Sequence, residues 1–207
     1  MKHKLDIASW NRKEHFEFFS QMEEPFFGFT LSIDCTEAYK KAKKLNISFF
    51  IYYLHKTLIA VNAIENFRYR IIEGEVFIYD KINVSATIMR EDKTFGFSLI
   101  EFDEDIQKFN LIAKKEIERI QHTSGLFTRE FSETNLIHFS AVPWINFSSV
   151  SHGRSFTWPD SCPKIAFGEL TETNGKKSMP FSVHAHHGLM DGYHVGLFLE
   201  RLKAEMQ

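Results

Sequence analysis

The chain has 207 residues, 43% of them hydrophobic and 25% charged, which is typical of a soluble globular protein. We expect residues 1–207 to form one domain, because nothing in this length or composition requires a second. Its 25 Lys and Arg against 27 Asp and Glu give a net charge of −2, so no basic field is available to attract nucleic acid. Phenylalanine is unusually abundant, with 22 residues, which indicates a core, pocket or subunit interface built from aromatic rings.

The cysteines and the distribution of apolar residues indicate the cellular compartment of the protein. Cys35 and Cys162 are far apart and form no CxxC pair, so neither a disulfide framework nor a thiolate metal site is expected. No run of about 18 apolar residues occurs, and the first ten residues lack the apolar region of a signal peptide. We therefore expect a cytoplasmic protein without a membrane partner.

The first half of the chain alternates between helical and strand patterns. Helical periodicity occupies residues 12–21, 36–45 and 49–64. The last of these is apolar nearly all round, which predicts a buried helix, and Ser48 is placed to cap it. Strand patterns occupy residues 26–33, 68–72, 76–79, 84–89 and 94–101. The second and third form a predicted hairpin through Gly74, and the two later runs are expected to extend its sheet.

The second half continues this alternation. Residues 105–121 carry an apolar stripe opposite a charged face, which predicts an amphipathic helix. Strands are expected at 136–142, 164–170 and 180–186, with a Pro- and Ser-containing segment between the first two, and a helix at 195–206. Because helices interleave with strands of which several form hairpins, we predict an α/β two-layer sandwich, a mixed β-sheet with helices packed on it.

The last predicted strand leads into the most informative segment, HHGLMDG at residues 186–192. Side chains alternate along a strand, so His187 is expected to point with Val183, opposite to His186. A neutral imidazole at a strand-to-helix junction can remove a proton from an alcohol, provided that an acceptor holds its other ring nitrogen. Asp191 could be that acceptor, or it could pair with an arginine and fix the turn.

Two other interpretations of these histidines stay open. They could only satisfy hydrogen bonds within the core, which is the usual role of an isolated buried histidine. Alternatively, His184 and His186, which project from one face, could bind a metal ion together with Asp191. No further cluster of histidines and carboxylates has ligand spacing, so we expect no metal.

Three segments carry a family resemblance. HHGLMDG resembles the HHxxxDG signature of coenzyme-A-dependent acyltransferases, which include the dihydrolipoamide acyltransferase catalytic domain and peptide-synthetase condensation domains. WNRKEHFE at residues 10–17 and PWINFSS at 143–149 resemble segments specific to chloramphenicol acetyltransferases, in the same order. With shorter matches at residues 67–71, 94–95 and 192–195, the similarity to this family covers almost the whole chain. It implies the coenzyme-A-dependent acyltransferase fold.

The resemblance also implies roles for four residues. His187 would be the general base that takes the proton of an acceptor hydroxyl while its oxygen attacks the thioester of acetyl-CoA. Ser149 would donate a hydrogen bond to the oxyanion of the tetrahedral intermediate. Asp191 and Arg12 would form an ion pair that braces the turn of residues 186–192. Neither a GxSxG nucleophile elbow nor a phosphate-binding GxxxxGK[ST] loop occurs, which favours direct transfer in a ternary complex.

The implied acceptor pocket departs from the family pattern. Its residues, carried over from the resemblance, are Phe18, Phe19, Phe29, Phe95, Phe97 and Ala166. Phe19 replaces a common tyrosine, and Phe97 stands where a small residue is usual. Ala166 replaces a threonine that helps to place a water molecule. These changes make the pocket more apolar and narrower, so acetyl transfer is a firmer expectation than chloramphenicol as the acceptor.

The resemblance finally implies an assembly and a function. It implies a homotrimer in which His187 of one subunit faces a pocket formed largely by the next, an interface that the many phenylalanines could fill. The expected function is O-acetyl transfer from acetyl-CoA to chloramphenicol or a similar small alcohol, with a role in antibiotic resistance. The alternative is a protein that binds coenzyme A or a small hydrophobic ligand without catalysis. The complete set of His187, Ser149, Asp191 and Arg12 favours the enzyme.

Overall fold

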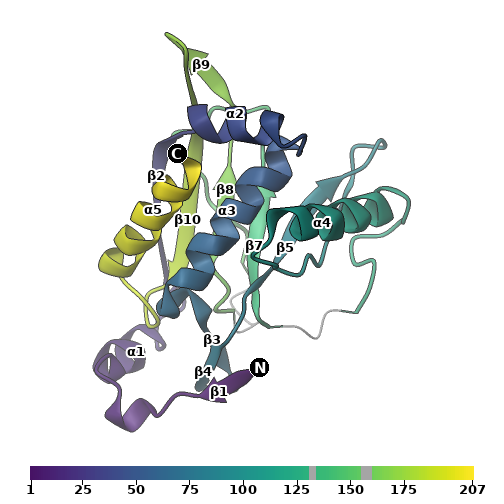
Figure 1. The fold of residues 1–207 in the computed structure, drawn as a ribbon. Helices are drawn as coiled ribbons and strands as arrows, with labels where there is room; N and C mark the ends of the chain where they lie inside the picture. The colour runs from purple at the N-terminus through teal and green to yellow at the C-terminus, as the bar shows by residue number, and fades with distance from the viewer. Residues whose placement is uncertain (131–133, 155–159) are drawn as a thin grey trace.

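A seven-stranded mixed sheet dominates the computed structural model, which describes residues 1–130, 134–154 and 160–207 (Figure 1). Six strands follow the order β2-β10-β8-β7-β5-β6. The seventh, β9, pairs with the first residues of β10 and lies outside this linear order. The β5–β7 and β7–β8 pairs are parallel, whereas β10 runs antiparallel to β2 and β8, and β6 runs antiparallel to β5. The strands are β2 (Phe26–Asp34), β5 (Asn83–Met89), β6 (Phe95–Phe97), β7 (Leu136–Ala141), β8 (Lys164–Phe167), β9 (Thr171–Thr173) and β10 (Lys176–His186).

Helices cover one face of this sheet, with α3 across its middle and α5 and α4 on either side (Figure 1). The helices of this layer are α2 (Thr36–Lys44), α3 (Phe49–Ala63), α4 (Ile106–Gln121) and α5 (Gly192–Met206). Helix α3 is buried along most of its length, as its apolar sequence predicts. Ser48 occupies the position before α3, but its side chain makes no capping hydrogen bond, so that prediction was wrong. The two layers confirm the predicted fold class.

A second, three-stranded sheet lies at one end of the molecule, beside α1 (Figure 1). It consists of β1 (Lys2–Lys4), β4 (Glu75–Tyr79) and β3 (Tyr69–Ile72), and α1 spans Lys13–Phe19. The hairpin was expected to share a sheet with residues 84–101, and that expectation was wrong. Both edges of β5 are already paired, with β6 and β7, so the hairpin joins β1 instead. The side chains of Phe16, Tyr69 and Leu189 form a small core between this sheet, α1 and the residues after β10.

The remaining differences from the predicted elements are local. Strands β1 and β9, and the 3-10 helices Ile7–Ser9 and Glu65–Arg68, were not predicted. Strand β6 is shorter than the predicted run because the Ser98 hydroxyl accepts the Ala86 amide, which interrupts the backbone ladder. Residues 155–159 of the predicted Pro- and Ser-containing segment lie outside the described residues. None of the helices in the described ranges has the length and apolar composition needed to cross a bilayer.

Candidate active site

His187 follows the last residue of β10, and two aromatic rings fix its imidazole. The ring of Phe19 is stacked on it at 3.9 Å between centroids and 3° between planes, and Phe27 lies at 4.4 Å. Its backbone amide donates to the carbonyl of Pro25, which continues the pairing between β10 and β2. His186 instead meets Phe26, the neighbour of Phe27 on the opposite face of β2. The two histidines therefore have different surroundings, as strand alternation predicts.

The turn that follows, residues 186–192, is held by its own hydrogen bonds. The amide of Gly188 donates to Nδ1 of His186 at 3.1 Å, and the amide of Leu189 donates to the carbonyl of His186. The side chain of Asn66 donates to the carbonyl of Leu189 at 3.0 Å. A Cβ atom at Gly188 would lie 3.1 Å from the His186 ring, so glycine suits this position. The backbone next to His187 is consequently fixed from both sides.

Arg12 connects this turn to the N-terminal segment. Its Nη1 atom lies 2.6 Å from Oδ2 of Asp191, and its Nη2 atom donates to the backbone carbonyl of His187 at 3.2 Å. The other carboxylate oxygen of Asp191 accepts the amide of Tyr193 and contacts the ring of His194, which caps α5. Burial opposes ionisation of Asp191, but the hydrogen bond from Arg12 and the nearby His194 outweigh it and lower its pKa to about 2. Asp191 thus braces the turn and makes no hydrogen bond with His187.

Removing this brace is expected to destabilise the protein. Arg12→Ala leaves a half-buried carboxylate and the His187 carbonyl without their donor, and we expect the free energy of unfolding to fall by about 2 kcal/mol. Urea unfolding followed by circular dichroism measures the change. Lys13→Ala is the control, because Lys13 is exposed and lies 3.9 Å from Glu17 on the same helix. Equal unfolding midpoints for the two variants would contradict the assignment.

The buried His186 predicts a loss of stability in mild acid. Burial lowers its pKa from 6.5 to about 4, with smaller contributions from nearby charges. Because histidine in the unfolded chain titrates near pH 6.5, the unfolded state binds more protons than the folded state between pH 6.5 and 4. The stability from neutral His186 is therefore complete above pH 6.5 and is lost as the pH falls towards 4.

Urea unfolding at two pH values tests this expectation. From about pH 6.5 to about pH 4.5, His186 alone should lower the free energy of unfolding by about 2 kcal/mol. His186→Asn offers an amide oxygen to the Gly188 amide but has no titrating group, so its loss over the same interval should be smaller. An equal loss in the wild type and this variant would show that His186 is not responsible.

Two predicted pocket residues accompany Phe19 beside His187. Phe18 is exposed and packs edge-on against Phe19 at 5.2 Å. Phe29, also exposed, lies on β2 next to Phe27 and faces the start of α5 at Gly192. These rings, His187, Arg12 and Asp191 form what we call the histidine group.

The other predicted site residues lie elsewhere in the chain. Ser149 is exposed in an irregular segment after β7. Two residues before it, Phe147 packs against Gly168, whose amide donates to the carbonyl of Pro180. Pro180 and His187 are seven positions apart on an extended strand, which corresponds to roughly 23 Å. Ser149 therefore follows a residue that packs beside Pro180, towards the middle of β10, whereas His187 follows the end of that strand.

Phe95, Phe97 and Ala166 are also separate from His187. The two phenylalanines belong to β6, at the opposite edge of the sheet from β2. Strand β6 lies four strand spacings from β10, which is about 19 Å. Ala166 is fully buried on β8, between Ser140 and Ser182. With Ser149, these residues form what we call the serine group. The predicted site residues therefore fall into two groups within the chain.

The three residues considered for a metal ion have other contacts. His186 accepts the Gly188 amide, and Asp191 contacts Arg12 and His194. The ring of His184 lies directly over Gly28, where a Cβ atom would approach it to 2.4 Å. Across residues 1–130, 134–154 and 160–207, His, Cys, Asp and Glu side chains form no group of three suited to a metal ion.

Sequence reasoning missed three contributors to the histidine group. Phe27 packs against His187, and strand alternation between β2 and β10 could have indicated this contact once their register was known. His186 accepts a hydrogen bond that fixes the turn, a role that its position in the motif does not reveal. Asn66 comes from a distant part of the chain, and no signal in the sequence points to its contact with Leu189.

Comparison with solved structures first concerns the fold. A crystal structure of a probable dihydrolipoamide acetyltransferase from Listeria monocytogenes superposes with a TM-score of 0.65 at 13% identity, over 93% of this chain and 88% of that one, so the two proteins share a fold. A solved chloramphenicol acetyltransferase superposes with a TM-score of 0.92 at 31% identity, over 100% of both chains. A family profile described as chloramphenicol acetyltransferase matches residues 1–203.

Individual relatives agree with this match. A chloramphenicol acetyltransferase of Klebsiella is 29% identical over 96% of this chain and 91% of the relative. Chloramphenicol acetyltransferase 3 of Escherichia coli is 28% identical over 97% of this chain and 94% of the relative. The chain belongs to the chloramphenicol acetyltransferase family.

Proposed function

We propose that the protein is an O-acetyltransferase that moves the acetyl group of acetyl-CoA to a hydroxyl of chloramphenicol or a similar small alcohol. The observation that carries this proposal is the fixed imidazole of His187, which lies between two aromatic rings and next to the Arg12 brace. Family membership supports acetyl transfer, and the names of the relatives support chloramphenicol as the acceptor and a role in antibiotic resistance.

In the proposed reaction, His187 removes the proton of the acceptor hydroxyl while that oxygen attacks the thioester carbon of acetyl-CoA. Nδ1 of His187 is buried, so Nε2 is the nitrogen that takes the proton. The former carbonyl oxygen becomes negatively charged, and the Ser149 hydroxyl donates a hydrogen bond to it. The carbon–sulfur bond then breaks, the proton passes from His187 to the sulfur, and coenzyme A leaves as a thiol. The route uses no metal ion.

We propose a homotrimer with shared active sites, as the family resemblance implies. The base and the oxyanion donor must both contact the reacting atoms, and within the chain Ser149 follows a residue that packs beside Pro180, seven positions before His187 on β10. A contact between the histidine group of one subunit and the serine group of the next joins two different surfaces, and such contacts form a closed ring when the rotation from one subunit to the next closes. Exposed apolar side chains in both groups support this arrangement, among them Phe18 and Phe29 in the histidine group and Phe95 in the serine group.

Three residues of the proposed pocket, Phe19, Ala166 and Phe97, indicate what kind of acceptor it would bind. Phe19 has no hydroxyl to offer a ligand, and its ring already covers one face of His187. Ala166 lacks the hydroxyl that would place a water molecule, which should slow transfer without abolishing it. Phe97 adds apolar volume to the proposed pocket. We therefore propose an acceptor with an apolar body and a single reactive hydroxyl.

A thiol-release assay tests the proposal. The purified protein is mixed with acetyl-CoA and chloramphenicol, and free coenzyme A is measured with a thiol reagent, alongside a panel of other small alcohols. We expect thiol release well above the hydrolysis measured without acceptor, with one acetyl ester formed for each thiol. Background release with every alcohol, together with calorimetric binding of acetyl-CoA, would instead favour a binding protein without catalysis.

We propose the cytoplasm as the compartment. Cys35 and Cys162 are both free thiols, with Cys35 buried, which suits a reducing environment.

A further inference from the structure

Three phenylalanine rings form a cluster at the β6 edge, which we call the β6 wall: Phe95, Phe97 and Phe127. Phe95 and Phe97 pack edge-on at 5.6 Å, and Phe97 and Phe127 are 5.4 Å apart. Phe95 and Phe127 are exposed, with 44% and 68% of their surface accessible. The wall comes from two segments, residues 94–99 and 125–129, which are joined by a hydrogen bond from the Phe97 amide to the carbonyl of Leu126.

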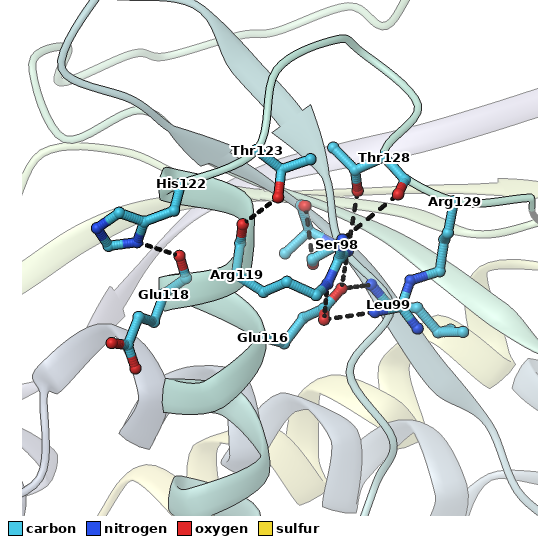
Figure 2. Close-up of polar contacts among 10 residues, drawn as sticks. Ser98, Leu99, Glu116, Glu118, Arg119, His122, Thr123, Thr128 and Arg129 are labelled. Atoms are coloured by element: carbon cyan, nitrogen blue, oxygen red, sulfur yellow. Dashed lines mark hydrogen bonds and ion pairs between the residues drawn. The ribbon is translucent and has the colours of Figure 1, made fainter.

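Glu116 of α4 lies behind this wall and contacts both segments (Figure 2). One of its carboxylate oxygens accepts the amide of Leu99 at 2.9 Å. The other accepts Nη2 of Arg129 at 2.6 Å and Nε of Arg119 at 2.8 Å. Arg119 in turn donates to the hydroxyl of Thr128 at 2.9 Å. A single buried carboxylate thus connects the end of one segment to the end of the other.

Arg90 holds the opposite ends of the same two segments. Its guanidinium donates to the hydroxyl of Thr94 and to the carbonyl of Gly125, and it is buried under Gly96. Each segment is therefore fixed before and after the phenylalanines that it contributes. This leaves the β6 wall little freedom to shift, although its rings are exposed.

The carboxylate of Glu116 is ionised although it is buried. Its side chain is only 7% exposed, and burial alone would raise its pKa. The hydrogen bonds from Arg119 and Leu99 and the charge of Arg129 outweigh burial and lower the pKa, so the carboxylate stays ionised. It accepts four hydrogen bonds in all, because Nη2 of Arg119 also donates to it, at 2.9 Å.

We infer that Glu116 is a positioning residue that sets the β6 wall against the apolar part of the acceptor. This inference rests on the proposed function, because Phe95 and Phe97 belong to the proposed acceptor pocket. Glu116 acts through the two segments and does not touch the reacting atoms. Its loss should weaken acceptor binding while the base and the thioester contacts remain in place.

The test compares Glu116→Gln with Glu118→Gln. Glutamine retains an oxygen for Leu99 but loses the charge that holds both arginines. Glu118 is exposed on the same helix, and its side chain points away from the network (Figure 2). In Glu116→Gln we expect the KM for chloramphenicol to rise about tenfold, with kcat and the KM for acetyl-CoA within about twofold. Hydrogen exchange should increase in residues 94–99 and 125–129, and Glu118→Gln should match the wild type in every measurement.

Unchanged KM for chloramphenicol in Glu116→Gln would overturn the inference, as would an equal rise in both KM values. If Glu116→Gln does not fold, Arg129→Gln removes one contact from an exposed side chain and should raise the KM for chloramphenicol about threefold.

Thiol release by the wild-type protein separately tests the proposed function. If the wild type binds chloramphenicol without transfer, the same comparison is made on the calorimetric Kd, and an equal Kd in both variants counts against the inference. A wild type that neither acetylates nor binds chloramphenicol also overturns it.

Discussion

His187→Ala should lower kcat for acetyl transfer by about a thousandfold, because a positioned general base contributes between roughly a hundredfold and ten-thousandfold. The imidazole packs against Phe19 and Phe27, so its contribution depends on a ring position that alanine cannot reproduce. The substitution removes a half-buried ring without disturbing the Arg12 contact, which uses the backbone carbonyl of residue 187. We therefore expect a folded protein that has lost its base.

His15→Ala is the matched control for this variant, since His15 is exposed on α1, close in sequence to Phe19. Thiol release with saturating acetyl-CoA and acceptor gives kcat, and circular dichroism checks that both variants are folded. Thiol release at the wild-type rate in His187→Ala would overturn the assignment of the base.

A mixture of two inactive variants should recover activity. Ser149→Ala alone should lose roughly a hundredfold to a thousandfold in kcat through its missing oxyanion donor. When His187→Ala and Ser149→Ala chains are unfolded together and refolded, some sites combine an intact His187 with an intact Ser149. If each site uses the histidine of one subunit and the serine of the next, random mixing restores about a quarter of the sites.

The control replaces Ser149→Ala chains with chains that carry both substitutions, and that mixture has no intact histidine to contribute. Light scattering accompanies the assay and should give three times the chain mass of 24.3 kDa. A mixture that stays at the rate of its two parents, or a particle of the single-chain mass, would rule out the shared site.

Much of the histidine group could be predicted from the sequence. Strand alternation separated His187 from His186, and the rings of Phe27 and Phe26 now explain how each is surrounded. The contact between Arg12 and Asp191 came from the resemblance, and the structure contains it. These residues lie within short segments whose local conformation strongly limits where the side chains can point.

The rest depended on pairing between distant segments. Whether the hairpin of β3 and β4 joined the main sheet was decided by strands that already occupied both edges of β5. Strand β1 has the sequence Lys-His-Lys, which carries no apolar alternation, so only its partner β4 makes it a strand. The distance of β6, with Phe95 and Phe97, from β10 likewise follows from strand order, which local patterns do not encode.

The contact between Arg12 and Asp191 spans 179 positions of the chain. During synthesis from the N-terminus, Arg12 lacks this partner until Asp191 has left the ribosome, and the cap of α5 forms with the same carboxylate. Contacts with such large sequence separation form late because the closing loop costs entropy before it gives any stabilisation. The ion pair that braces residues 186–192 thus forms only after residue 191 has been made, and a chain that terminates before residue 191 cannot form it.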